Sequence, residues 1–248
     1  MLTGSKSLEM FYFFHSGFGI KTEREILIFD YYREAKNADG SKNHLAKKLI
    51  EERGKRKCYV FTSHSHPDHY SPIIYEWQKE DPEIEYVLSE DVFGTEKAQN
   101  RTIVSSGDKK KIGQLEIEVF GSTDAGVSFL VKTGQFNIFH AGDLNWWHWN
   151  GETAAYNEAM ARDYKREIDL LASSTLDLAF VPVDLRLEDK YHWGIKYLFE
   201  KAAVNKVVPM HFWQDYSIYE KLKKDLPDHF SKIILLVPGQ TDYRIVFP

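Results

Sequence analysis

The sequence has one cysteine, Cys58, no long apolar run and no surplus of basic residues. A single cysteine cannot form a disulfide within the chain or build a cysteine-based zinc finger, so a reducing compartment is the simpler expectation. The apolar segment from Met10 to Phe14 is too short for a signal-peptide core or a membrane span. We therefore expect a cytoplasmic protein that does not bind membranes.

The charge balance argues against a general nucleic-acid-binding protein. The 248 residues include 32 lysines and arginines and 37 aspartates and glutamates, which gives a formal net charge of −5. Non-specific affinity for DNA or RNA comes mainly from neutralising phosphates with basic side chains. Hydrophobic residues make up 43% and charged residues 28% of the chain, as is typical of globular proteins. We expect a small-molecule substrate, and the oligomeric state stays open.

The chain also lacks linkers and repeats. No stretch is rich in Pro, Gly and Ser together, and no repeat with a period of about 20 to 50 residues indicates a solenoid. Short apolar segments alternate with amphipathic segments instead, and this alternation is typical of an α/β protein. Both halves of the chain run from strands into strand–helix units. We therefore predict one domain over residues 1–248, with two similar halves that share a core.

Hydrophobic periodicity and turn residues predict the individual elements. The strands are expected near residues 10–14, 25–30, 57–62, 115–119, 127–132, 135–140, 178–183, 206–209, 233–237 and 243–246. The helices are expected near residues 43–53, 72–80, 153–171, 194–203 and 217–226. Ser71 followed by Pro72 is a good helix start, because Ser caps free N–H groups and Pro fits the first helical position.

The most informative motif is His64-Ser65-His66-Pro67-Asp68-His69, directly after the apolar strand that ends at Thr62. It places three imidazoles and one carboxylate within a short turn. Zinc and similar metals prefer nitrogen and oxygen ligands of this kind. Because the motif follows a buried strand and precedes a capped helix, metal binding is favoured over a surface loop that happens to be rich in histidine.

Two further candidate ligands follow predicted strands. Asp143 ends the segment His140-Ala141-Gly142-Asp143, and His211 ends the segment Val207-Val208-Pro209-Met210-His211. An isolated aspartate after a strand is usually a turn or cap residue, and an isolated histidine is usually structural. The two residues therefore become metal-ligand candidates only together with the histidine motif.

Taken together, these segments resemble the metallo-β-lactamase superfamily. The resemblance rests on the H-x-H-x-D-H motif, the strand-ending Gly142-Asp143 and the strand-ending His211. Asp30 matches the early Asp of the family, which supports the metal-site loop. His15-Ser16-Gly17-Phe18 and the segments that end at Asp143 and His211 are similar to the branch that contains L-ascorbate-6-phosphate lactonase. The resemblance implies an α/β fold: a four-layer αβ/βα sandwich of two mixed sheets.

The resemblance also implies two metal positions joined by a bridging carboxylate. The implied ligands are His64 and His66 for the first metal, Asp68, His69 and His211 for the second, and Asp143 as the bridge. We expect one or two Zn2+ ions, with Mn2+ as an alternative. The implied activity is hydrolysis of a small ester, lactone or phosphate-bearing metabolite by a metal-bound hydroxide, with Asp68 acting as a catalytic residue on the water.

One feature departs from the family pattern. The family usually supplies another His to the first metal from the segment before the bridging Asp, but residues 120–126 contain none. Asp124 is the nearest residue that can bind a metal strongly, and a role as a turn residue is equally open. A carboxylate in place of an imidazole would shift the preference of this position from zinc toward manganese or magnesium.

Candidates for substrate contacts are found in two loops. Trp146 belongs to an aromatic run after Asp143 that either lines a pocket or packs at a core edge. Arg186 and His192 fall between a strand and a helix, where this architecture usually places substrate contacts. Arg186 is a candidate anion-binding residue, and His192 is a candidate proton donor to the leaving group.

Two other functions stay open at this point. One is a phosphodiesterase or nuclease of the same superfamily, against which the acidic balance argues. The other is a non-catalytic metal-binding protein, which the missing His makes credible, although the presence of Asp68 argues for catalysis. An amidohydrolase barrel also begins with H-x-H after a strand, but it does not predict the Asp68-His69 pair or the later Gly142-Asp143.

Overall fold

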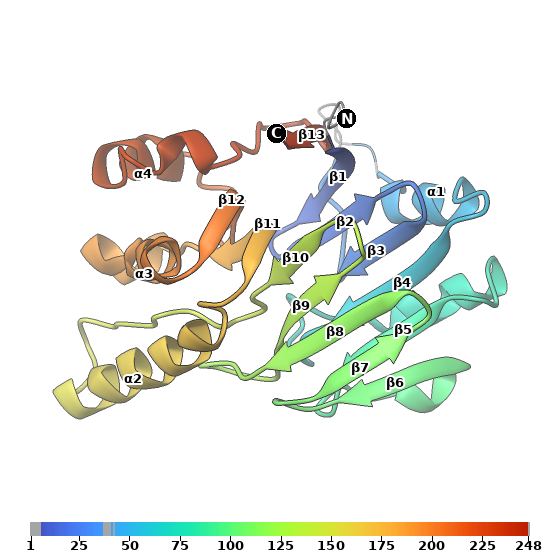
Figure 1. The fold of residues 1–248 in the computed structure, drawn as a ribbon, viewed down its shortest axis with the longest axis horizontal. Coiled ribbons are helices and arrows are strands. Elements are labelled where there is room, and N and C mark those ends of the chain that lie inside the picture. Colours follow the sequence, from blue (N-terminus) through green and yellow to red (C-terminus); the bar gives the residue numbers. More distant parts are fainter. Residues whose placement is uncertain (1–5, 37–40, 42, 248) are drawn as a thin grey trace. The chain divides into compact units, whose positions relative to one another are not determined.

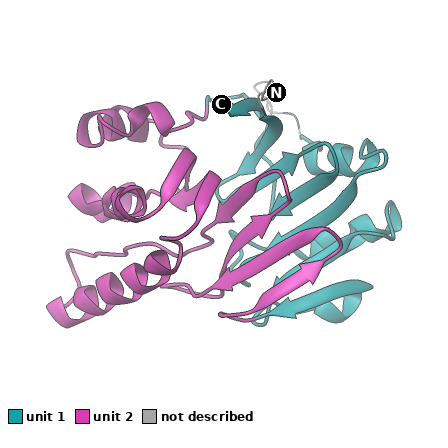
Figure 2. Ribbon diagram, viewed as in Figure 1, with its two compact units in different colours: residues 1–104, 237–248 teal, residues 105–236 magenta. Residues whose placement is uncertain are grey.

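The computed structural model describes residues 6–36, 41 and 43–247, which fall into two compact units. Unit 1 comprises residues 1–104 and 237–248, and unit 2 comprises residues 105–236 (Figure 2). Each unit contains its own mixed β-sheet. The single domain over residues 1–248 stays a prediction.

The sheet of unit 1 has the strand order β13-β1-β2-β3-β4-β5-β6 (Figure 1). Its strands are β1 (Lys6–Phe14), β2 (Gly17–Lys21), β3 (Glu25–Phe29), β4 (Lys57–Thr62), β5 (Glu85–Ser89), β6 (Asn100–Val104) and β13 (Asp242–Phe247). The pairs β13/β1, β1/β2 and β2/β3 are antiparallel, and the pairs from β3 to β6 are parallel. Every residue of β3 is buried, as is typical of a central strand next to a parallel neighbour.

The helices of unit 1 connect its parallel strands. They are α1 (Leu45–Glu51) and the 3₁₀ segments η1 (Pro72–Lys79) and η2 (Thr95–Lys97). The Glu34 carboxylate accepts hydrogen bonds from the N–H groups of Leu45 and Ala46, at 2.7 and 2.9 Å, and so caps α1. The predicted Ser71 cap is confirmed, because its hydroxyl accepts a hydrogen bond from the N–H of Ile73. The predicted helix there is 3₁₀ rather than α.

The sheet of unit 2 has the strand order β12-β11-β10-β9-β8-β7. Its strands are β7 (Lys109–Ile112), β8 (Leu115–Phe120), β9 (Ser128–Lys132), β10 (Asn137–His140), β11 (Thr175–Pro182) and β12 (Ala203–Met210). The pairs from β7 to β10 are antiparallel, and β10, β11 and β12 run parallel to one another. Each unit therefore contains three antiparallel pairings followed by parallel ones, which supports the predicted similarity of the two halves.

Three helices and two 3₁₀ segments complete unit 2. They are α2 (Ala154–Leu170), α3 (Trp193–Lys201), α4 (Ile218–Asp225), η3 (Leu185–Lys190) and η4 (Phe230–Lys232). Figure 1 shows the three α-helices on one side of the unit 2 sheet. The side chain of Thr153 accepts a hydrogen bond from the N–H of Tyr156 and caps α2. Within the described residues, no helix has both the length and the apolar character needed to cross a membrane.

The α/β class with two mixed sheets is confirmed, but some elements differ from the sequence prediction. The prediction missed β2, β5, β6 and β7; β2 lies between the two predicted strands at 10–14 and 25–30 and pairs with both. Strands β6 and β7 have half-exposed, polar sequences with little apolar alternation, so their pairing comes from their neighbours. The predicted strand at 233–237 is wrong, because only Ile233 forms an isolated bridge, to Val207.

Candidate metal sites

The candidate residues of unit 1 lie where three strands end at the same edge of the sheet. β3 leads into Asp30 and β4 leads into the histidine motif, and these two strands are parallel neighbours. β1 runs in the same direction as β3, because β2 is antiparallel to both, and it ends at the turn that contains His15. A Cβ atom at Gly17 would lie 3.0 Å from the carbonyl oxygen of Asp30. The glycine therefore allows the turn to approach Asp30 closely.

Asp30 is the centre of a buried hydrogen-bond network. Its Oδ1 accepts the N–H of Ser63 at 2.7 Å, and its Oδ2 lies 2.6 Å from the Ser63 hydroxyl. The same Oδ2 lies 2.8 Å from Nδ1 of His69. Ser63 Oγ in turn lies 2.8 Å from Nδ1 of His64. Asp30, which has a positive φ of 43°, therefore contacts His69 directly and His64 through the Ser63 hydroxyl.

This network determines which nitrogen of each imidazole carries a proton. An ionised carboxylate only accepts hydrogen bonds, so Nδ1 of His69 donates to Asp30. The single hydroxyl proton of Ser63 is also donated to Asp30, so Nδ1 of His64 donates to Ser63 Oγ. Both histidines therefore present Nε2 with a lone pair, which is the form that binds a metal ion.

The donor atoms of unit 1 gather at metal-binding distances. Asp30, His64 and His69 each have a ligand atom within 4.8 Å of those of the other two. The ring centroids of His64 and His66 lie 4.7 Å apart, and those of His64 and His69 lie 4.1 Å apart. Imidazole nitrogens and carboxylate oxygens without thiolates fit zinc, manganese or iron. The donor set of unit 1 therefore fits the implied metal.

His15 belongs to the same group, although the sequence pattern assigned it no role. Its ring is fully buried, and its Nε2 lies 3.6 Å from Oδ2 of Asp68. The ring centroids of His15 and His69 lie 5.8 Å apart. His15 has a φ of 56°, and its N–H donates to the Tyr12 hydroxyl at 3.0 Å. The glycine-flanked turn between two apolar strands was the available sequence signal.

The candidate residues of unit 2 also follow three parallel strands. Asp143 follows β10, Asp184 follows β11 and His211 follows β12. Nε2 of His211 lies 3.6 Å from Oδ1 of Asp143, and its Nδ1 lies 2.9 Å from Oδ2 of Asp184. The Asp184 carboxylate accepts the Nδ1 proton, so His211 directs the lone pair of Nε2 toward Asp143.

Neighbouring groups stabilise the ionised form of Asp184. Burial alone would raise its pKa, but hydrogen bonds from His211 and Arg186 outweigh burial and lower it to about 2. The guanidinium of Arg186 donates to both carboxylate oxygens, with Nε 3.0 and 2.9 Å from Oδ1 and Oδ2. Arg186 thus supports Asp184, while its side chain stays 54% exposed. Its anion-binding role stays a prediction.

Trp147 and Trp213 both lie beside His211, and the ring centroid of Trp213 is 5.9 Å from that of His211. The indole N–H of Trp147 donates to the carbonyl oxygen of Asp143 at 2.9 Å, and the ring centroids of Trp147 and His211 lie 5.4 Å apart. Trp146 packs instead on Trp193, with ring centroids 5.1 Å apart, and lines a separate cavity of about 470 Å³ between helices. The role of Trp146 in substrate binding therefore stays a prediction.

The other two predicted residues of unit 2 lie in different surroundings. Asp124 is exposed, and its N–H donates to the Ser122 hydroxyl at 3.3 Å in a turn. Among the described residues, no group of three or more possible ligands includes Asp124. The ring of His192 contacts Tyr191, and burial lowers its pKa while the Asp225 charge opposes that effect. Their roles as metal ligand and proton donor stay predictions.

Known structures share the architecture of the whole chain. A metallo hydrolase from the archaeon Ignicoccus hospitalis, Igni18, is 16% identical with a TM-score of 0.66, over 98% of this chain and 100% of the other. The metallo-β-lactamase fold protein YhfI from Bacillus subtilis is 10% identical with a TM-score of 0.64, over 98% and 100%. At such low identity the similarity defines the fold. The chain has the metallo-β-lactamase fold, as predicted.

The same fold also occurs around a different metal chemistry. CmlA from Streptomyces venezuelae, a diiron β-hydroxylase, has a TM-score of 0.64 at 10% identity, over 99% of this chain and 55% of the other. No protein-family model matches the sequence, and no curated protein matches it significantly. The fold alone therefore leaves the metal and the reaction to be argued from the residues.

Proposed function

We propose that the protein is a metal-dependent hydrolase of a small ester, lactone or phosphate-bearing metabolite. The observation that carries this proposal is the orientation of three histidines. His64, His69 and His211 each donate Nδ1–H to a buried oxygen acceptor and present Nε2 as a lone-pair donor. A purely structural histidine does not require its second nitrogen to be left in the metal-binding form.

The proposed metal ligands are those that the resemblance implies. They are His64, His66, Asp68, His69, Asp143 and His211. We propose one or two zinc ions and a cytoplasmic location. When bound, such an ion lowers the pKa of a water molecule and polarises a carbonyl or phosphoryl oxygen.

Asp68 is the proposed catalytic residue of this chain. Its side chain is 28% exposed, whereas the neighbouring His15 and His69 are fully buried, so of these three residues Asp68 is the one that solvent reaches. In hydrolysis, the oxygen of water forms a new bond to carbon or phosphorus and the bond to the leaving oxygen breaks. In the proposed reaction, Asp68 accepts the proton from that water.

The branch resemblance supports small phosphate-bearing lactones as the first substrates to test. The net charge of −5 supports a small molecule over nucleic acid. The experiment is a screen of purified protein of measured metal content against lactones, phosphodiesters and thioesters, with Asp68→Ala beside it. We expect turnover per bound metal to fall by about 100- to 10,000-fold in that variant, the range of general acid–base contributions.

The matched control is Glu83→Ala, because the Glu83 carboxylate is 60% exposed and pairs with Lys57 at the start of β4, the end of that strand opposite the histidine motif. This variant should keep wild-type turnover. Near-wild-type turnover of Asp68→Ala would refute the catalytic assignment. Tightly bound metal without any hydrolysis would favour a non-catalytic metal-binding protein. Salt-sensitive binding of RNA or DNA would favour a nuclease. Tightly bound iron would favour an oxidative enzyme.

A further inference from the structure

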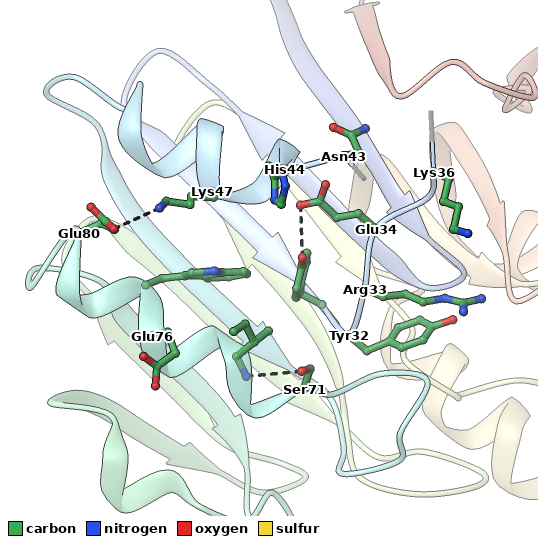
Figure 3. Close-up of a pocket in the computed structure, with 13 residues that line it drawn as sticks. Tyr32, Arg33, Glu34, Lys36, Asn43, His44, Lys47, Ser71, Glu76 and Glu80 are labelled. Carbon is green, nitrogen blue, oxygen red and sulfur yellow. Dashed lines mark hydrogen bonds and ion pairs between the residues drawn. The ribbon is translucent and has the colours of Figure 1, made fainter. Parts of the chain in front are cut away.

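Figure 3 shows a cavity in unit 1 whose lining residues include none of the candidate metal ligands. Its volume is about 660 Å³, within the size range of small-molecule sites. One wall is apolar: the rings of Tyr31 and Trp77 meet edge to face, with centroids 4.8 Å apart, and Ile73 is 46% exposed. The cavity can therefore cover the apolar part of a small ligand.

The three carboxylates that line the cavity already have partners. Glu34 caps α1 and accepts the Tyr31 hydroxyl at 3.3 Å. Glu80 pairs with Lys47 at 3.3 Å, and Glu76 pairs with Lys79. These negative charges are held by helix N–H groups and lysines, so they are not directed at a cationic ligand.

Arg33 differs from these carboxylates, because its guanidinium packs against aromatic rings and hydrogen-bonds the Tyr32 side chain. Its guanidinium carbon lies 3.9 Å from the ring centroid of Phe14 and 5.3 Å from that of Tyr32. Within the described part of the chain, no ion pair joins Arg33 to a carboxylate. The rings contact the face of the guanidinium, whose five N–H donors lie in its plane. A hydrogen bond to the Tyr32 side chain uses part of this donor edge, and the remaining donors can bind a ligand. Such an edge matches a carboxylate or phosphate.

Tyr32 connects this end of the cavity to the metal-binding group. Figure 3 shows the Tyr32 and Arg33 side chains extending alongside each other at one end of the cavity, with Lys47 and Glu80 at the other. The ring centroid of Tyr32 lies 6.4 Å from that of His15, whose Nε2 is 3.6 Å from Asp68. A ligand held by Arg33 would therefore lie next to the candidate metal ligands of unit 1.

We propose that this cavity binds the substrate through an anionic group, with Arg33 donating hydrogen bonds to a carboxylate or phosphate and the wall of Tyr31, Ile73 and Trp77 covering its apolar part. This inference rests on the proposed hydrolytic function and adds its substrate class, a small anionic ester or lactone. Arg33 is then a specificity-determining residue. The bond to be broken lies on the Tyr32 side of the anion.

The first experiment compares two esters that differ only in an anionic group: 4-nitrophenyl butyrate and mono-4-nitrophenyl glutarate. The wild-type protein should hydrolyse the glutarate ester with the higher kcat/KM. Arg33→Gln should lower kcat/KM for the anionic ester by about 10- to 100-fold, the range of charge-assisted hydrogen bonds, and change the neutral ester less than about twofold. Arg33→Lys should recover part of the loss, because the charge remains and the planar pair of donors is removed.

The control is Arg101→Gln, which makes the same change in charge outside the cavity. Arg101 is exposed on β6, and its guanidinium donates to the carbonyl oxygen of Ala98 at 2.9 Å. Both esters should be hydrolysed by this variant as by wild type. An equal loss in Arg33→Gln and Arg101→Gln, or an equal loss for both esters, would overturn the assignment of Arg33.

A binding experiment separates this inference from the hydrolase proposal. Glutarate and propyl phosphate are titrated calorimetrically into the metal-loaded wild type, Arg33→Gln and Arg101→Gln. We expect Arg33→Gln alone to weaken binding about tenfold or more, and the anion more affected identifies carboxylate or phosphate as the natural group. Equal affinity of wild type and Arg33→Gln for both anions overturns the inference. Selective anion binding without hydrolysis of any ester overturns the proposed function alone.

Discussion

Nδ1 of His69 lies 2.8 Å from Oδ2 of Asp30, and both side chains are fully buried. The same carboxylate accepts two hydrogen bonds from Ser63, whose hydroxyl holds His64. One buried aspartate therefore sets the orientation and tautomer of two candidate metal ligands. Such supporting contacts typically change metal affinity by about 10- to 100-fold when they are removed.

Asp30→Asn is expected to lower the affinity for Zn2+ by about 10- to 100-fold. The amide keeps the size of the carboxylate, but an amide N–H group that faces His69 favours the opposite tautomer, with Nε2 protonated and unable to bind metal. Competition with a chromogenic chelator measures the affinity. Glu83→Gln is the control and should bind zinc as wild type does, because Glu83 is an exposed carboxylate that pairs with Lys57 at the far end of β4. Unchanged affinity of Asp30→Asn would show that the network is structural only.

Asp184→Asn should weaken the contribution of His211 in the same way, again by about 10-fold or more in metal affinity. The cause is the loss of the 2.9 Å contact between Asp184 and Nδ1 of His211. Asp189→Asn is the matched control, because Asp189 is exposed and pairs with Lys190. Wild-type affinity of Asp184→Asn would mean that His211 needs no carboxylate to bind metal.

The low pKa of Asp184 also predicts an effect of pH on the metal-free protein. Its folded pKa of about 2 lies below the ordinary value of 3.8, so the unfolded chain binds its proton first as the pH falls. The stabilisation is complete well above pH 3.8 and is lost as the pH approaches 2. Denaturant titrations between pH 5 and pH 2 should therefore show a steeper loss of stability for wild type than for Asp184→Asn. Parallel curves would contradict this account.

Gly17→Ala should destabilise unit 1 by about 1–3 kcal/mol, the usual cost of forcing extra atoms into a packed site. The new Cβ atom would lie 3.0 Å from the carbonyl oxygen of Asp30 and 3.1 Å from that of Phe14, and backbone atoms cannot move aside cheaply. Gly151→Ala is the control, because no atom lies within 4 Å of its added Cβ. Urea denaturation measures both, and equal stability of the two variants would show that the turn adjusts without cost.

Cys58 should be unreactive in the folded protein. Its side chain is buried in β4, and burial raises the pKa of the thiol well above its ordinary value, so the reactive thiolate is scarce. A thiol-specific chromogenic disulfide at pH 8 should label the native protein orders of magnitude more slowly than protein in concentrated guanidinium. Cys58 is the only cysteine, so the signal reports this site alone. Rapid native labelling would show that β4 opens easily.

Local order along the chain was enough to predict the candidate ligands. The histidine motif directly follows a buried strand, and His211 directly follows another, so strand direction alone brings such residues to a sheet edge. The alternation of apolar and amphipathic segments predicted the α/β class in the same way. These inferences depend on neighbouring residues, whose relative positions the backbone geometry of a strand and its following turn largely determines.

The supporting contacts depended on the tertiary structure. Nε2 of His15 lies close to Asp68 in unit 1, and Nδ1 of His211 lies close to Asp184 in unit 2. In each unit, the order and direction of the strands bring loops that are far apart in sequence to the same edge of that unit's sheet. The same packing brings Trp147 rather than Trp146 beside His211. The hydrophobic periodicity of the sequence does not predict these contacts, because strand pairing brings together residues that are many positions apart in the chain. The sequence by itself thus determined which side chains are candidate metal ligands, and only the fold decided which carboxylate contacts each of them.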